Sequence, residues 1–105
     1  MASDRTAPVV PSVDAFLHEL VRLRLLAFLS VLKRADFVYL LRQSGLSRGN
    51  LSVQMTKLAE AGLVEIEKGF LGNRPRTVYA LTKRGRTALQ AYKADMTTLL
   101  EALPD

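Results

Sequence analysis

Residues 36–81 read DFVYLLRQSGLSRGNLSVQMTKLAEAGLVEIEKGFLGNRPRTVYAL, and this stretch decides the fold. Asp36 is predicted to cap a helix that ends at Gly45, because Asp accepts hydrogen bonds from the free amides at a helix start. Ser47 is predicted to cap the next helix, and Gly62 follows its last turn, where a left-handed glycine stops a helix. A turn this short between two helices predicts a helix-turn-helix unit. The inner faces of the two helices are Phe37, Leu40 and Leu41, and Leu51, Met55, Leu58 and Ala59.

The apolar pattern then changes from helical spacing to alternation. Residues 63–67 alternate apolar and charged side chains around Val64 and Ile66, which predicts a half-buried strand, and TVYAL at residues 77–81 predicts a second strand. Residues 69–75, GFLGNRP, are rich in turn-forming residues and predict a loop between the strands. We therefore expect an antiparallel hairpin with a basic tip. A last helix is expected over residues 82–103, with Thr82 as its cap.

The region before the helix-turn-helix unit predicts an arm and one long helix. Residues 1–11 are polar and without a period, which favours a flexible N-terminal arm. Ser12 is predicted to cap a helix from Val13 to Leu32, because apolar residues recur there at steps of three and four. That helix is apolar on nearly all sides, which indicates burial in the core or against a second chain. Residues 12–105 are expected to form a single domain.

Three segments together resemble a known family: VRLRLLAFL at residues 21–29, GNLSVQMTKLAEAGLVEIEK at 49–68 and GNRPRTVYALTKRG at 72–85. They resemble the winged-helix transcriptional regulators of the small MarR/ArsR-like group, over residues 21–92. The resemblance implies an α+β, mainly α, winged helix-turn-helix with a two-stranded wing and a long C-terminal dimerisation helix. It also implies a dimeric DNA-binding protein. ArsR-type metal sensors carry cysteine or histidine clusters, which this sequence lacks, so metal sensing is not expected.

Composition and charge narrow the function classes. The 105 residues carry a formal net charge of +5, no cysteine and one histidine. From Lys68 to Ala94 there are seven basic residues and no acid, which indicates a polyanionic partner. His18 is predicted to be structural, and Glu65 and Glu67 lack the pocket that acid–base catalysis needs. No enzyme activity, metal or cofactor is expected. With no apolar run of membrane length and no signal-peptide core, a cytoplasmic protein without membrane contact is expected.

The second helix of the unit is the predicted reading element. A helix fits the major groove of DNA, where Arg pairs with guanine, Asn or Gln pairs with adenine, and Val touches a thymine methyl group. A solvated helix face would instead carry more Glu and Lys. The predicted contacts of this helix are Ser47, Arg48, Gly49, Asn50, Ser52, Val53, Gln54 and Lys57. Those of the wing, whose arginines suit a narrow minor groove, are Asn73, Arg74, Arg76 and Thr77. Four further cations are expected either to contact phosphate or only to keep the surface soluble: Lys68, Lys83, Arg84 and Arg86.

The first and last helices carry more apolar surface than one small domain needs. Exposed stripes of this size mark interfaces, so we expect a two-fold homodimer and a near-palindromic DNA site. The alternative is that the last helix folds over the first within one chain. The predicted interface residues are Phe16, Leu20, Leu23, Leu89, Tyr92, Met96, Leu99, Leu100 and Leu103.

Together these patterns predict a sequence-specific regulator that binds double-stranded DNA as a dimer. The alternative function is a winged helix that binds another protein through the same surface, without DNA. A further variant binds RNA or the DNA backbone without sequence preference, because basic residues alone produce such binding. The sequence does not identify a small-molecule effector or the DNA sequence that is bound.

Overall fold

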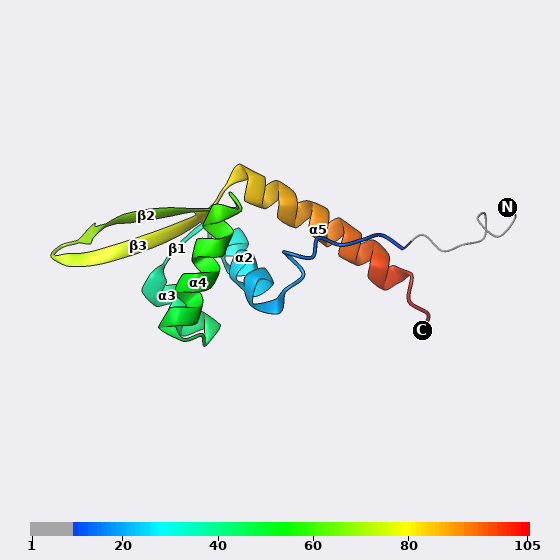
Figure 1. The fold of residues 1–105 in the computed structure, drawn as a ribbon, viewed down its shortest axis with the longest axis horizontal. Coiled ribbons are helices and arrows are strands. Elements are labelled where there is room, and N and C mark those ends of the chain that lie inside the picture. Colours follow the sequence, from blue (N-terminus) through cyan, green and yellow to red (C-terminus); the bar gives the residue numbers. More distant parts are fainter. Residues whose placement is uncertain (1–9) are drawn as a thin grey trace, which may run out of the picture.

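The computed structural model describes residues 10–105 (Figure 1). Its elements are α2 (Leu20–Leu32), β1 (Arg34–Asp36), α3 (Phe37–Ser44), α4 (Arg48–Glu60), β2 (Val64–Leu71), β3 (Arg74–Leu81) and α5 (Lys83–Glu101). This order confirms the predicted winged helix-turn-helix, with three strands instead of two. The predicted arm over residues 1–11 lies almost entirely outside the described residues. None of the helices within residues 10–105 is both long and apolar enough to cross a membrane.

The predicted start of the first helix is wrong. Instead of a cap at Ser12 and a helix from Val13, a short turn precedes α2, which begins only at Leu20. The carboxylate of Asp14 accepts hydrogen bonds from the amides two and three residues further on, at 2.9 and 3.2 Å. This local side-chain bond offers the backbone an alternative to a continuous helix. Apolar periodicity runs through both segments and therefore does not reveal the break.

Glu19 is the true cap of α2. Its carboxylate oxygens accept hydrogen bonds from the amides of Val21 at 3.1 Å and Arg22 at 2.9 Å. These amides stabilise the charged form, and the bond from Arg22 is the main reason that the pKa of Glu19 lies below its ordinary value. A negative charge at this position also complements the positive end of the helix dipole.

The helix-turn-helix unit forms as predicted. Asp36 and Ser47 each accept a hydrogen bond from the amide three residues on, at 2.8 and 3.1 Å, and so cap α3 and α4. Gly45 and Gly62 have φ angles of +71° and +78°, the left-handed conformation expected after each helix. The turn between α3 and α4 is therefore determined by local chemistry at each of its ends.

The sheet has one strand more than predicted. Its order is β1-β3-β2, with both pairs antiparallel, and β1 pairs with Val78–Ala80 of β3. In β1 only Ala35 is buried, so this strand of three residues has no alternating pattern to signal it. It is a strand because the edge of β3 lies beside it in the folded chain.

The hairpin is longer and its turn tighter than predicted. The expected loop over residues 69–75 is wrong, because β2 and β3 stay paired as far as Leu71 and Arg74. Gly72 has a φ angle of +63°, which suits the first central position of a two-residue hairpin turn. Pro75 is tolerated because β1 does not reach it, so β3 is an edge strand there. The wing is therefore a long paired ribbon instead of a loop.

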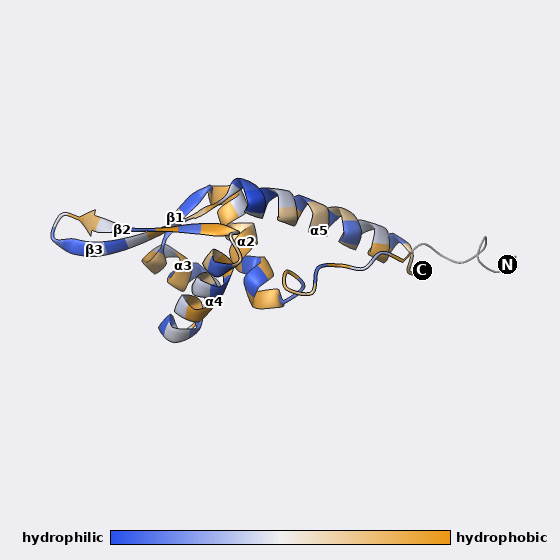
Figure 2. Cartoon of the chain, turned by 45° about the horizontal axis from the view of Figure 1, so that its top comes forward, coloured by the Kyte–Doolittle hydropathy of each residue, from blue (hydrophilic) through white to orange (hydrophobic). Residues whose placement is uncertain are grey.

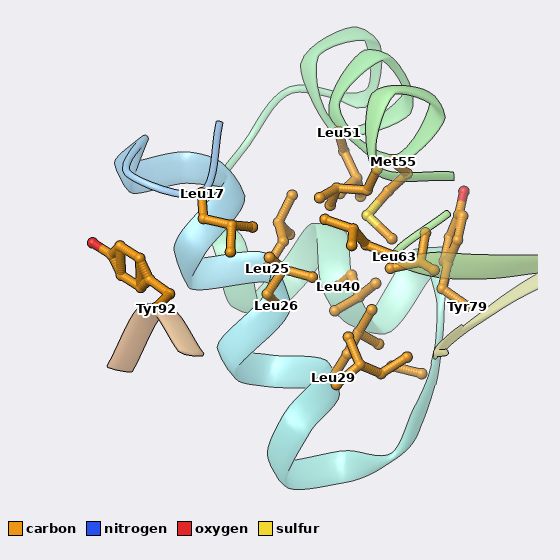
Figure 3. Close-up of a cluster of buried hydrophobic side chains, with 14 residues drawn as sticks. Leu17, Leu25, Leu26, Leu29, Leu40, Leu51, Met55, Leu63, Tyr79 and Tyr92 are labelled. Carbon is orange, nitrogen blue, oxygen red and sulfur yellow. The ribbon is translucent and has the colours of Figure 1, made fainter. Parts of the chain in front are cut away.

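The core lies where α2, α3 and α4 meet the base of the sheet (Figure 3). Tyr79 closes it on the side of the sheet, and Tyr92 of α5 lies at its other end. The hydroxyl of Tyr92 is 2.8 Å from Nδ1 of His18, which agrees with the predicted structural histidine. The largest fully buried side chains are Leu17, Leu25, Leu26, Leu29, Leu40, Leu51, Met55 and Leu58.

A close junction joins α5 to the base of the hairpin. Thr82 caps α5 as predicted: its hydroxyl accepts from the amide of Gly85 at 2.9 Å and donates to the carbonyl of Gly62 at 2.7 Å. A Cβ at Gly85 would overlap the carbonyl oxygen of Leu63, so only glycine fits here. From this junction α5 and the hairpin extend in opposite directions, away from the helical body (Figure 1).

Candidate nucleic-acid interface

One face of α4 is anchored in the core and the other is open. Leu51, Met55 and Leu58 are fully buried, so the side chains on the opposite face of the helix point outward. Val53 lies on this outward face and is 51% exposed. Of the predicted DNA contacts on this helix, seven are exposed: Ser47, Arg48, Gly49, Asn50, Ser52, Val53 and Lys57.

Gln54 differs from the other predicted contacts because it is half-buried and already hydrogen-bonded. Its side-chain oxygen accepts from Nη1 of Arg22 at 3.3 Å, and its amide nitrogen donates to Oδ1 of Asn50 at 3.4 Å. Arg22 is itself held by the carbonyl of Phe16 at 2.9 Å and lies over that ring, 4.4 Å from its centre. Gln54 thus links α2 to the exposed Asn50. Arg22 was not among the predicted contacts, although its charge within the apolar run VRLRLLAFL was a signal.

Arg48 lies at the start of α4 beside the wing. Its guanidinium lies over the ring of Phe37, 5.5 Å from the ring centre, which is within the range of a cation–π contact. Arg48, Arg74 and Arg76 line one cleft of about 380 Å³ between α4, the start of α3 and the hairpin. Three cations from distant parts of the sequence therefore converge on one concave surface, which also includes Asp36.

The two predicted wing arginines are placed differently. Nε of Arg76 is 3.4 Å from Oδ2 of Asp36, the acid that also caps α3. This contact leaves the terminal nitrogens of Arg76 available to a further acceptor. Arg74 lies beside the turn and has no acidic partner among residues 10–105. The pairing of Asp36 with Arg76 has no local sequence signal, since 40 positions separate them.

The remaining predicted wing residues occupy the turn and the base. Asn73 is exposed in the two-residue turn, whereas Thr77 is half-buried closer to the body. Thr77 lines a concavity of about 330 Å³ between the hairpin and α4, together with Ser52, Thr56 and Lys68. Phe37 and Thr77 line both this concavity and the arginine cleft, so the two hollows adjoin between α4 and the wing.

The basic residues that follow the wing are exposed on the first turns of α5. Lys83, Arg84 and Arg86 are all solvent-accessible. The side chain of Arg84 lies against Gly62, within 3.5 Å of the position that a Cβ would take there. Arg86 instead lines a groove between α2 and α5. The three cations are therefore spread over different surfaces.

That groove contains much of the predicted dimer surface. Its volume is about 590 Å³, and Leu23, Leu89, Met96 and Leu100 contribute apolar walls. Tyr92, also predicted to be at the interface, is only 5% exposed and is already buried within one chain. Of the other predicted interface residues, Phe16 and Leu99 are half-buried, and Leu20 and Leu103 are exposed.

Comparisons with known proteins agree with this architecture. The family model described as a winged helix DNA-binding domain matches residues 21–100. An uncharacterised protein of Methanocaldococcus jannaschii is 36% identical over 75 residues, which are 71% of this chain and 82% of that relative.

Solved structures of transcriptional regulators have the same overall architecture. A transcriptional regulator homologue from Pyrococcus horikoshii has a TM-score of 0.80 and 28% identity, and the match covers 86% of this chain and 89% of that one. A PadR family transcriptional regulator from Eggerthella lenta has a TM-score of 0.63 and 28% identity, over 83% of this chain and 84% of that one. A zinc-responsive MarR family member from Lactococcus lactis has a TM-score of 0.63 at 14% identity, over 95% and 69%, and supports the fold alone.

These findings confirm the resemblance to winged-helix transcriptional regulators, which are DNA-binding proteins and not enzymes. The matched residues include the helix-turn-helix unit, the whole wing and most of α5. The chain belongs to the winged helix DNA-binding domain family.

Proposed function

We propose that the chain is a dimeric transcriptional regulator that recognises a specific double-stranded DNA site. In this proposal α4 enters the major groove and the β2–β3 wing enters the adjacent minor groove. The observation that carries it is the cleft shared by Arg48, Arg74 and Arg76, which joins the start of α4 to the wing. A duplex that lies across this surface meets cations from both elements, and cations supply most of the affinity for phosphate.

Base recognition is assigned to the exposed end of α4. Arg48 has donors for guanine, and Asn50 has a donor and an acceptor for adenine. The bond from Gln54 restricts the rotation of the Asn50 amide and leaves a second lone pair on Oδ1. We therefore assign Gln54 the role of positioning Asn50, in place of the direct contact predicted from the sequence.

The dimer is proposed to form around the groove between α2 and α5. Leu100, on the part of α5 that extends from the body, is 57% exposed, and Leu103, just beyond the end of α5, is 61% exposed. The radius of gyration is 17.4 Å, against about 13 Å for a compact domain of this length. A second copy of the chain would cover this extension by packing its own α5 beside it, and two-fold symmetry would then give a near-palindromic site.

The test is binding to a labelled duplex, followed by fluorescence anisotropy at several salt concentrations. A pool of random duplexes supplies the preferred site first. For wild type we expect an affinity that falls steeply with salt, and for Arg74→Ala/Arg76→Ala a log–log slope shallower by about one for each lost phosphate contact. Lys33→Asn is the control, since it removes one exposed cation at the C-terminal end of α2, outside the arginine cleft.

Two results would contradict the proposal. An unchanged slope in the double variant would remove the wing from the interface. Failure of the wild type to bind any duplex at low salt would favour the protein-binding alternative, for which the exposed Val53 at the centre of the outward face is the supporting observation.

A further inference from the structure

The far end of the hairpin carries two large apolar side chains in solvent. Phe70 is 75% exposed and Leu71 is 65% exposed, and both lie at the end of β2, next to the turn. Figure 2 shows this hydrophobic end of β2 beside the hydrophilic start of β3. Single exposed apolar residues are common on protein surfaces. Two adjacent ones at the end of a projecting hairpin instead indicate a contact with a binding partner.

The pairing of the strands gives this tip a defined shape. Phe70 lies opposite Pro75, and Leu71 lies opposite Arg74. Because successive side chains of a strand point to opposite faces, Leu71 lies on the face that lines the arginine cleft and Phe70 lies on the other face of the ribbon. The two-residue turn beyond them consists of Gly72 and the exposed Asn73. The tip is therefore a narrow apolar wedge on a hydrogen-bonded support.

The charges around the wedge identify its partner. Lys68, Arg74 and Arg76 lie in the same part of the hairpin, and no acid occurs between Lys68 and Ala94. The two acids nearest to this region are both paired with arginines: Asp36 with Arg76 at 3.4 Å, and Glu67 with Arg34 at 2.9 Å. Two apolar side chains surrounded by cations are complementary to a polyanion that has an apolar interior. Double-stranded DNA is such a polyanion, because its stacked base pairs lie between two rows of phosphates.

We propose that Phe70 and Leu71 insert into the minor groove, partly separate two stacked base pairs and kink the DNA at each wing. This inference rests on the proposed function and adds a mode of recognition to it. Apolar side chains that enter the minor groove unstack base steps and bend the duplex by about 20–90°. The flanking arginines then hold phosphates beside the kink.

The wedge creates sequence preference at positions where the wing makes no hydrogen bond to a base. Pyrimidine–purine steps such as TA and CA are kinked most easily, so the site should contain one of them under each wing tip. Such a preference differs from that of α4, which depends on hydrogen bonds in the major groove.

The experiment measures affinity, bend and unstacking with the full chain and the duplex selected from the random pool. Energy transfer between dyes at the two DNA ends reports the bend, and 2-aminopurine at the step under the wing reports unstacking. For wild type we expect a bend and a rise in 2-aminopurine fluorescence. For Phe70→Ser/Leu71→Ser we expect both signals to be lost and the affinity to fall about tenfold, with the salt slope unchanged.

Two controls separate the wedge from other effects. Arg74→Ala should lower the salt slope but keep the bend, because it removes a phosphate contact and leaves the wedge. Val31→Ser removes a side chain that is 82% exposed on α2, and should change neither signal. Chemical unfolding curves check that the wing variant folds, which is expected because both side chains lie in solvent.

The outcomes distinguish the inference from the function on which it rests. Salt-dependent binding by wild type without bend or unstacking would overturn the wedge and leave the proposed function intact. An equal bend for wild type and Phe70→Ser/Leu71→Ser would also overturn it. If wild type binds no duplex, the proposed function fails and the wedge fails with it.

Discussion

At the scale of single residues, Gly49 is a position where helix stability and DNA binding favour different residues. It lies in the first turn of α4, and a Cβ added there would have no atom within 4 Å. Its φ angle is not positive, so neither space nor backbone conformation requires glycine. Glycine within a helix is less stable than alanine by up to about 1 kcal/mol. A close approach of DNA to this backbone would explain why glycine occupies the position.

Gly49→Ala should therefore change stability and binding in opposite directions. We expect the free energy of unfolding to rise by up to about 1 kcal/mol, as measured by urea denaturation. The affinity for the selected duplex should fall by about tenfold, which is about 1.4 kcal/mol, because the new methyl group meets the DNA. Unchanged affinity would mean that the backbone of α4 does not approach the bases at this point.

At the scale of elements, Asp36 joins α3 to the wing. One carboxylate oxygen caps α3 through the amide of Tyr39 at 2.8 Å, and the other is 3.4 Å from Nε of Arg76. Both side chains of the ion pair are partly exposed, at 29% for Asp36 and 45% for Arg76. Pairs of this kind contribute about 0–1 kcal/mol to stability, whereas an N-cap contributes about 1 kcal/mol. The cap is therefore the larger of the two contributions.

Two substitutions at Asp36 separate these contributions. Asp36→Asn keeps a capping oxygen and loses only the charge, so its free energy of unfolding should stay within about 0.5 kcal/mol of wild type. Asp36→Ala loses the cap as well and should unfold more easily, by about 1 kcal/mol in urea. Both should bind DNA more tightly at low salt, because a negative charge beside Arg76 is gone. Equal destabilisation by the two variants would instead identify the ion pair as the main contribution.

At the scale of the whole molecule, two elements extend from a small body in opposite directions. The hairpin is proposed to reach DNA, and α5 is proposed to reach a second chain. The exposed Leu100 lies on the extended part of α5 and the exposed Leu103 follows just beyond its end, although Tyr92 of the same helix is buried against the body. Packing within one chain therefore accounts for the first half of α5 but leaves apolar surface on its second half.

The dimer can be tested by light scattering at micromolar concentration. Wild type should have twice the 11.6 kDa mass of one chain. Leu100→Arg should have the mass of one chain, because it adds a positive charge to an apolar groove whose own charged residues, Arg86 and Lys93, are also positive. Thr98→Arg, about two hundred degrees away around the same helix, should remain a dimer. A wild-type mass of one chain would overturn the dimer and with it the near-palindromic site.

The sequence by itself determined the elements whose signals are local. Asp36, Ser47 and Thr82 cap helices, and Gly45 and Gly62 end them, because each acts within a few residues along the chain. These signals were sufficient to predict the helix-turn-helix, the hairpin and the final helix. Where two local signals competed, as in the segment before α2, periodicity alone predicted the wrong helix start.

Only the tertiary structure decided the features that depend on distant residues. β1 is a strand because β3 lies beside it, and the cleft of Arg48, Arg74 and Arg76 exists because the fold brings α4 and the wing together. Gln54 likewise bonds to Arg22 from another helix. Pairing along a strand edge and contacts between side chains far apart in sequence have no local pattern, since their partners are selected by packing of the whole chain.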